Sequence, residues 1–250
     1  MDEMQLLQDL HRAQERQGPG SEDATMRAIE LALPDKRDGL KIADIGCGTG
    51  AAAVVLAREL DARITAVDFL QGFLDILGER AQRLGLADRI SCLKSSMDAL
   101  PFSDCEFDLI WSEGAVYNMG FTAGVRAWRR FLKSGGILAV SELTWLTATR
   151  PPEIEAHWQG EYPEIDTAST KMRVLEECGY APVGYFVLPR ECWMENYYLP
   201  LRQNFAAFLE RNPGSAARAI MEAEEREISL YERFGKYFSY GFYIARKEGE

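Results

Sequence analysis

The period of hydrophobic positions changes several times along the chain. Short apolar runs predict strands, at 42–45, 63–68, 89–94, 107–112 and 136–142. Apolar residues three or four positions apart predict helices between these runs, over 51–60, 69–85 and 122–132. Strands that alternate with helices in this way form parallel βαβ units with right-handed crossovers. We therefore expect an α/β fold with a doubly wound, mostly parallel, seven-stranded sheet.

The N-terminal residues precede this alternation. Residues 1–39 contain two helical stretches separated by Gly18-Pro19-Gly20, and Ser21 is placed to cap the second stretch. We expect this part to form a helical cover on the α/β fold, within a single domain over residues 1–250.

After residue 145 the predicted strands and helices no longer alternate regularly. Residues 146–165 contain three prolines, which predict a connection rather than a strand. A helix at 166–178 and a strand at 183–188 are expected to follow. Residues 190–235 predict a helical insertion, with Pro200 breaking its first half, before a last strand at 237–246.

Composition and charge narrow the functional classes. The chain has 250 residues and a formal net charge of -11, which opposes binding to nucleic acid. It has no apolar run of about 18 residues that would span a membrane, and its charged first residues do not resemble a signal peptide. The five cysteines form no CxxC pair, which argues against a zinc site and favours a reducing compartment. We expect a soluble, cytoplasmic enzyme for small molecules, with no bound metal and no nucleic-acid or membrane partner.

The densest chemical signal is a glycine-rich turn between a predicted strand and a predicted helix. Asp44 precedes Gly46-Cys47-Gly48-Thr49-Gly50, and glycines there let the backbone approach a ligand closely. Asp68 follows at the end of the next predicted strand, where a carboxylate can accept both hydroxyl protons of a ribose. Alone, Asp68 can equally cap the helix that begins at Phe69. The GxGxG spacing differs from the GxGxxG of a dinucleotide-binding fold.

This pattern resembles motif I of the class I S-adenosylmethionine-dependent methyltransferases. The resemblance continues in order through Asp68, the stretch 96–102, the strand at 107–110 and the turn at 132–138. It implies S-adenosylmethionine as the cofactor, S-adenosylhomocysteine as the product, ribose binding by Asp68, and adenine flanked by Ser96 and Met97. Ser96 stands where many members have Asp. The cofactor-binding residues expected from the turn and the resemblance are Asp44, Gly46, Cys47, Gly48, Gly50, Asp68, Phe69, Ser96, Met97 and Glu113.

Candidate catalytic residues follow the strand at 107–112. Glu113 is a candidate general base, a counter-charge to the sulfonium or to a cationic substrate, or a helix cap. Tyr117 lies one turn further on and can face the same cavity or simply pack. The two histidines, His11 and His157, lie outside the motifs, and we expect His157 at the surface.

Aromatic residues concentrate near the C-terminus, where residues 185–250 hold 14 of the 27. The aromatic residues of the insertion are Trp193, Tyr197, Tyr198, Phe205 and Phe208. They can form a pocket wall, pack on the sheet or make a homodimer contact, and we expect at least one of them to line a substrate pocket. The function that the sequence favours is methyl transfer to an unidentified small molecule. The alternatives are a nicotinamide-dependent oxidoreductase and a non-catalytic nucleotide-binding module on the same fold.

Overall fold

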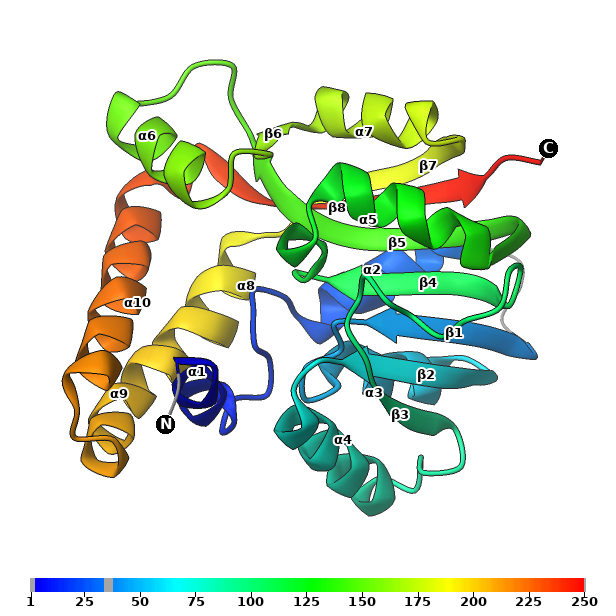
Figure 1. Ribbon diagram of the computed structural model, residues 1–250. Coiled ribbons are helices and arrows are strands. Elements are labelled where there is room, and N and C mark those ends of the chain that lie inside the picture. The colour runs from blue at the N-terminus through cyan, green and yellow to red at the C-terminus, as the bar shows by residue number, and fades with distance from the viewer. Residues whose placement is uncertain (1–2, 34–37, 250) are drawn as a thin grey trace.

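The computed structural model describes residues 3–33 and 38–249, so part of the predicted N-terminal cover lies outside the described residues (Figure 1). Its centre is a sheet with the strand order β3-β2-β1-β4-β5-β8-β7, to which β6 adds a short pairing with β5. Strands β1 to β5 pair with one another in parallel, and β8 is antiparallel to both β5 and β7. The expected doubly wound, mostly parallel sheet is confirmed. The strands are β1 (Leu40–Ile45), β2 (Ala62–Asp68), β3 (Ile90–Lys94), β4 (Phe107–Glu113), β5 (Leu132–Trp145), β6 (Asp166–Thr167), β7 (Tyr180–Val187) and β8 (Phe238–Lys247).

Helices bury the two faces of the sheet in separate hydrophobic cores. One core includes helical residues of α2 (Glu22–Ala32), α3 (Ala51–Glu59) and α4 (Gln71–Arg83) and continues into the N-terminal helix and the C-terminal insertion. The other takes them from α5 (Phe121–Trp128) and α7 (Ala168–Glu177). The Ser21 side chain accepts a hydrogen bond from the Ala24 amide at 3.0 Å, which confirms the predicted cap of α2. Short 3₁₀ turns flank α5, at Val116–Asn118 and Arg129–Phe131.

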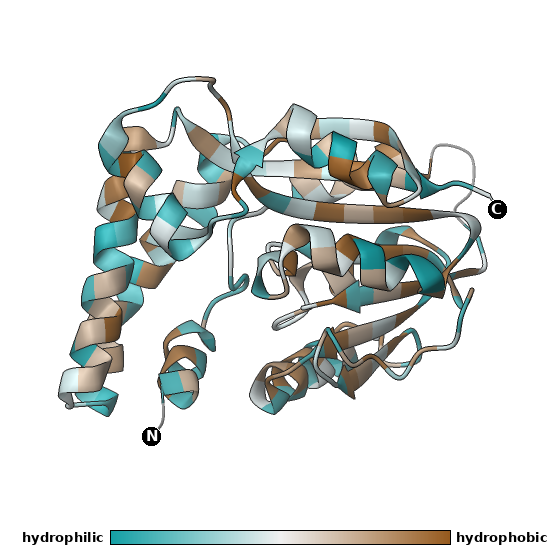
Figure 2. Cartoon of the chain, turned by 45° about the horizontal axis from the view of Figure 1, so that its top comes forward, coloured by the Kyte–Doolittle hydropathy of each residue, from teal (hydrophilic) through white to brown (hydrophobic). Residues whose placement is uncertain are grey.

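The remaining helices lie beyond the carboxyl ends of the parallel strands, at the left of Figure 1. They are α1 (Glu3–His11), α6 (Pro152–Glu161), α8 (Arg190–Trp193), α9 (Leu199–Arg211) and α10 (Ser215–Phe234). Helix α1 contacts both α9 and α10. Figure 2 shows hydrophobic positions concentrated in the strands, whereas α9 and α10 alternate between hydrophilic and hydrophobic positions. Within the described ranges, every helix is too short or too polar to cross a membrane. In open α/β sheets this end of the strands is where ligands bind.

Two sequence-based expectations about prolines differ from the structure. The connection over 146–165 contains helix α6, because Pro152 occupies the first turn, where a missing backbone N–H costs no hydrogen bond. Pro200 does not break the insertion either. A π-helical turn at Met194–Tyr198 joins α8 directly to α9, and Pro200 occupies the first turn of α9. The Asn212-Pro213-Gly214 turn does separate α9 from α10.

Candidate active site

The glycine-rich turn after β1 passes tightly against the chain that follows β4. Gly46 and Gly48 have φ of 77° and 54°, a left-handed conformation that favours glycine. The Val67 carbonyl accepts hydrogen bonds at 2.9 Å from the amides of both Gly46 and Cys47, which fixes the turn to β2. A Cβ built on Gly46 would lie 2.3 Å from the Cβ of Ala115. The backbone conformation and the neighbouring methyl group therefore both require glycine at position 46.

Asp68 holds the other side of this turn. One carboxylate oxygen accepts a hydrogen bond from the Gly48 amide at 2.9 Å, and the other accepts one from the Leu70 amide at 2.9 Å. Burial raises the pKa of Asp68, while these amides and that of Phe69 oppose the rise. Because each carboxylate oxygen has two lone pairs, both oxygens can still accept a hydrogen bond from a ligand hydroxyl.

Asp44, at the end of β1, is a buried carboxylate with an unused acceptor. It is 1% exposed, and its Oδ2 has no hydrogen-bond partner within the described part of the chain. Burial is the main reason that its pKa is raised well above the ordinary value, and the charges of Glu113 and Asp68 add to the effect. Buried polar atoms are nearly always paired, so this oxygen is a ready acceptor for a donor group on a bound molecule.

These residues line one cavity of about 900 Å³ at the carboxyl ends of the strands. The cavity brings together the following residues singled out from the sequence: Asp44, Gly46, Cys47, Gly48, Asp68, Phe69, Ser96, Met97, Glu113 and Tyr117. Gly50 does not line it. The structure gives Gly50 a packing role instead, because a Cβ there would lie 2.1 Å from Cδ1 of Leu77.

Glu113 is held by three donors rather than free to act on a substrate. One of its oxygens forms an ion pair with Arg16 at 2.7 Å, in which both side chains are about nine-tenths buried. The other oxygen accepts hydrogen bonds from the Thr25 hydroxyl at 2.7 Å and the Trp111 indole N–H at 2.9 Å. These contacts favour a role that the sequence did not suggest, which is anchoring the N-terminal segment next to the cavity, over taking a proton as a general base.

Residues just before α2 lie across the glycine-rich turn. The side-chain oxygen of Gln17 accepts hydrogen bonds from the amide of Thr49 at 2.9 Å and from its hydroxyl at 3.1 Å. The Glu15 carboxylate is 2.8 Å from Arg80 of α4. Arg16 and Gln17 were not identified from the sequence, because no local motif marks them and only the fold brings them to the turn.

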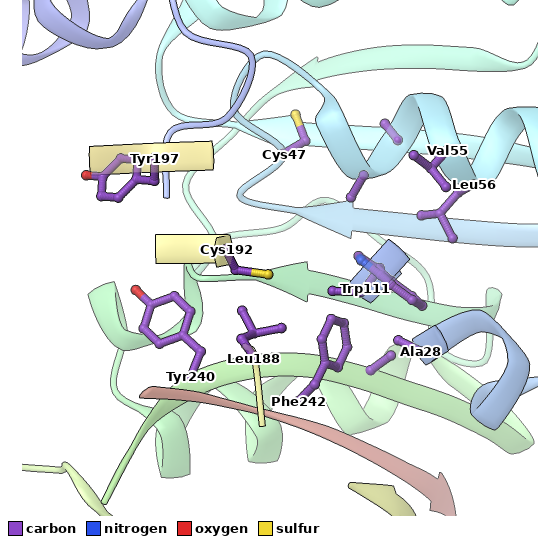
Figure 3. Close-up of a cluster of buried hydrophobic side chains, with 14 of the residues drawn as sticks. Ala28, Cys47, Val55, Leu56, Trp111, Leu188, Cys192, Tyr197, Tyr240 and Phe242 are labelled. Atoms are coloured by element: carbon purple, nitrogen blue, oxygen red, sulfur yellow. The ribbon is translucent and has the colours of Figure 1, made fainter. Parts of the chain in front are cut away.

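The far end of the cavity is lined by residues from the N-terminal helix, α6 and the insertion. His157 lines it and is half-buried, with Nε2 buried, so the expectation of a surface position is wrong. Trp193 and Tyr197, two of the five insertion aromatics, also line it. Figure 3 shows Tyr197 and Tyr240 at one end of the buried cluster that includes Cys47, with Cys192 between them and Trp111. Tyr198 and Phe208 are fully buried and pack instead.

Tyr117, just after β4, lines the cavity as well. It is 43% exposed and lines the cavity, so its surface is open to a ligand. Its ring packs edge-on against Tyr162, with 6.2 Å between ring centroids. Its position in the cavity wall and the nearby charge of Glu227 raise the pKa of Tyr117.

Comparison with known proteins identifies the part of the chain that carries the turn. Residues 42–136 match the family model for a methyltransferase domain. This matched stretch contains the glycine-rich turn and Asp68. The methyltransferase GfsG of Streptomyces halstedii is 32% identical over 110 residues, which cover 44% of this chain and 40% of that protein. The 27-O-demethylrifamycin SV methyltransferase of Amycolatopsis mediterranei is 28% identical over 143 residues, which cover 54% and 52%. The chain thus spans about half of the length of these curated relatives, or less.

Solved structures share the fold of this chain, including the helices beyond the carboxyl ends of the strands. A methyltransferase from Geobacter sulfurreducens, crystallised with S-adenosyl-L-homocysteine, superposes with a TM-score of 0.83 at 20% identity, covering 96% of this chain and 97% of that one. The [4+2]-cyclase SpnF superposes with a TM-score of 0.77 at 23% identity, covering 99% and 93%. The same architecture therefore supports different chemistries, and the function has to be argued from the site.

Proposed function

We propose that this protein is an S-adenosylmethionine-dependent methyltransferase that acts on a small molecule. The observation that carries the proposal is the cavity itself. It joins the glycine-rich turn and Asp68 to a second compartment, which we define by its aromatic and acidic side chains Tyr117, Tyr197, Tyr240 and Glu227. A methyl donor and an acceptor have to meet in one space that excludes water, and a cavity of about 900 Å³ is at the upper end of the range for small-molecule sites.

The residues at the turn fit the proposed cofactor. Gly46 keeps the wall of the cavity free of a side chain, and the unpartnered Oδ2 of Asp44 is an acceptor for a donor such as an amino group. The Asp68 carboxylate would accept the ribose hydroxyl protons, and Phe69, which is 59% exposed and lines the cavity, would cover an apolar face of the nucleoside. Ser96 and Met97 lie on the same wall and would flank the adenine.

The chain's own contribution to the reaction is alignment and exclusion of water. When bound, the cofactor supplies a methyl group already activated by its sulfonium. The turn and Asp68 would hold the cofactor and offer this methyl group to a lone pair of the acceptor, and the electron pair of the broken carbon–sulfur bond would remain on sulfur. Correct placement of two reactants can supply several kcal/mol of rate enhancement without strong acid–base help. We therefore assign Glu113 a positioning role through Arg16, and Tyr117 a role in contacting the acceptor.

A transfer experiment tests this function directly. The protein is incubated with S-adenosylmethionine labelled in its methyl group and with a small-molecule metabolite extract, and labelled products are separated from the cofactor. We expect protein-dependent labelling that is lost in Asp68→Asn and kept in Asp88→Asn, an exposed carboxylate outside the cavity. A protein that binds the cofactor and labels nothing would be a binding module.

The oxidoreductase alternative is tested by titration with NAD⁺. The methyltransferase account predicts uptake of S-adenosylmethionine and none of NAD⁺. The reverse result would overturn it, because the GxGxG turn and Asp68 would then serve a dinucleotide.

A further inference from the structure

Three tyrosines and the carboxylate of Glu227 lie together in the second compartment of the cavity. Tyr117 follows β4, Tyr197 lies on the π-helical turn, Tyr240 lies on β8, and Glu227 projects from α10, and all four line the cavity. The pKa of each tyrosine is raised first by burial, and the charge of Glu227 contributes to the rise at all three. Glu227 is therefore within electrostatic reach of all three phenol groups, although the four residues come from four different elements.

Glu227 has no cationic partner of its own. Its Oε1 accepts a hydrogen bond from the Tyr198 hydroxyl at 2.7 Å, and no arginine, lysine or histidine in the described part of the chain forms an ion pair with it. Burial, with the neighbouring Glu224 adding to it, raises the pKa of Glu227 to about 7. Glu227 is partly buried, and carboxylates withdrawn from water are normally paired with a cation, so a positively charged group of a ligand would be favourable here.

A second side chain points to a missing ligand in the same compartment. His11 is 9% exposed and lines the cavity, and its Nδ1 has no hydrogen-bond partner among the described residues. Its ring is stacked on Tyr197 at 6.1 Å, and its Nε2 is 3.7 Å from Glu224. A buried ring nitrogen without a partner is rare in a folded protein and indicates a polar group that a bound molecule or water would supply.

From this arrangement we propose that the methyl acceptor carries an ammonium group, which the Glu227 carboxylate and the aromatic side chains of Tyr117, Tyr197 and Tyr240 hold in this compartment. The proposal rests on the proposed methyltransferase function. A carboxylate neutralises the cation, and aromatic faces attract it through their electron-rich π systems. Groups of aromatic side chains recognise quaternary ammonium ligands in this way.

The other charges around the cavity agree with a cationic acceptor. Among the described residues that line it, the basic side chains other than histidine are Arg16 and Arg226. Arg16 is engaged with Glu113, and Arg226 is exposed. Glu161 and Glu224 line the same compartment as Glu227. An anionic acceptor would therefore have to approach three carboxylates with one unengaged arginine to offset them.

A binding experiment with matched probes separates charge from shape. Choline carries the ammonium group, and 3,3-dimethylbutan-1-ol has the same shape without the charge. Each is titrated calorimetrically into the 250-residue chain, with and without saturating S-adenosylhomocysteine. We expect choline to bind at least tenfold more tightly than the alcohol. We expect Glu227→Gln to weaken choline at least tenfold and leave the alcohol unchanged, while Glu222→Gln, exposed on the same helix, changes neither.

The Tyr117 variant keeps the test valid if Glu227→Gln fails to fold. Tyr117→Leu replaces a 43% exposed ring, and we expect it to weaken choline about fivefold or more without changing the affinity for S-adenosylhomocysteine. Equal binding of choline and the alcohol, or full choline affinity in a folded Glu227→Gln or Tyr117→Leu protein, would overturn the ammonium proposal. Failure of S-adenosylhomocysteine to bind, with choline discrimination intact, would instead refute the proposed function and leave the cation site standing.

Discussion

The requirement for glycine at position 46 gives a prediction that links the turn to cofactor binding. Gly46→Ala places a residue with a side chain at φ of 77°, and its Cβ would lie 2.3 Å from Cβ of Ala115. The left-handed conformation costs about 1–2 kcal/mol, and forcing a methyl group into a filled space costs about 1–3 kcal/mol. We therefore expect Gly46→Ala to lower the free energy of unfolding by about 2–5 kcal/mol.

Gly85 provides the matched control for the backbone term. It has φ of 69°, and no heavy atom lies within 4 Å of a Cβ built on it. Gly85→Ala should cost only the conformational part, about 1–2 kcal/mol. Both substitutions reduce the entropy of the unfolded chain equally, so this effect cancels in the comparison.

The clash term is isolated by removing the methyl group that Gly46→Ala would meet. In a double-mutant cycle, Ala115→Gly should return about 1–3 kcal/mol to Gly46→Ala. Urea unfolding measures these differences, and calorimetry with S-adenosylhomocysteine should show at least a tenfold loss of affinity in Gly46→Ala alone. The reasoning is refuted if Gly46→Ala is no less stable than Gly85→Ala, or if Ala115→Gly gives no recovery.

Three further perturbations test other parts of the site. Arg16→Met should lower the free energy of unfolding by about 3–5 kcal/mol, because it leaves the buried Glu113 carboxylate without its cation; a coupling energy near zero in a double-mutant cycle with Glu113→Gln would contradict this. Burial raises the pKa of Glu142 to about 7, so the folded protein keeps a proton that the unfolded chain releases above its ordinary pKa of 4.5. The stability that this proton contributes is present below pH 4.5 and is lost as the pH rises to 7. The free energy of unfolding of wild type should therefore fall by up to about 3 kcal/mol relative to that of Glu142→Gln between these pH values. Parallel curves of unfolding free energy against pH for the two proteins would disprove it. Phe69→Ala should weaken S-adenosylhomocysteine severalfold while changing stability by less than about 0.5 kcal/mol, because the ring is 59% exposed and lines the cavity; unchanged affinity would remove Phe69 from the site.

The sheet and the glycine-rich turn were predictable because they depend on local signals. Apolar runs of strand length and a glycine cluster between a strand and a helix are readable in any stretch of chain. The Ser21 cap is local in the same sense, since the hydrogen bond spans three residues. Pro152 and Pro200 were misread because proline marks either the end of a helix or its first turn, and the sequence does not distinguish the two.

The second compartment was not predictable in detail because its residues meet only through the fold. Tyr117 and Tyr240 are more than a hundred positions apart in the sequence. No spacing rule connects either of them to Glu227. The concentration of aromatic residues near the C-terminus did indicate a pocket wall, and Trp193 and Tyr197 lie in it. The ion pair between Arg16 and Glu113 joins positions 97 apart, so the sequence offered roles for Glu113 without its partner.

Binding of S-adenosylhomocysteine through Asp68 is the central claim, and calorimetric titration of wild type, Asp68→Asn and Asp88→Asn measures it. Asp68→Asn exchanges one charged acceptor for a donor, and a hydrogen bond to a charged group contributes about 1.5–3 kcal/mol. The account predicts one molecule bound per chain, with affinity lowered tenfold or more in Asp68→Asn and unchanged in Asp88→Asn. Absence of binding to wild type, or equal affinity in all three proteins, would contradict it.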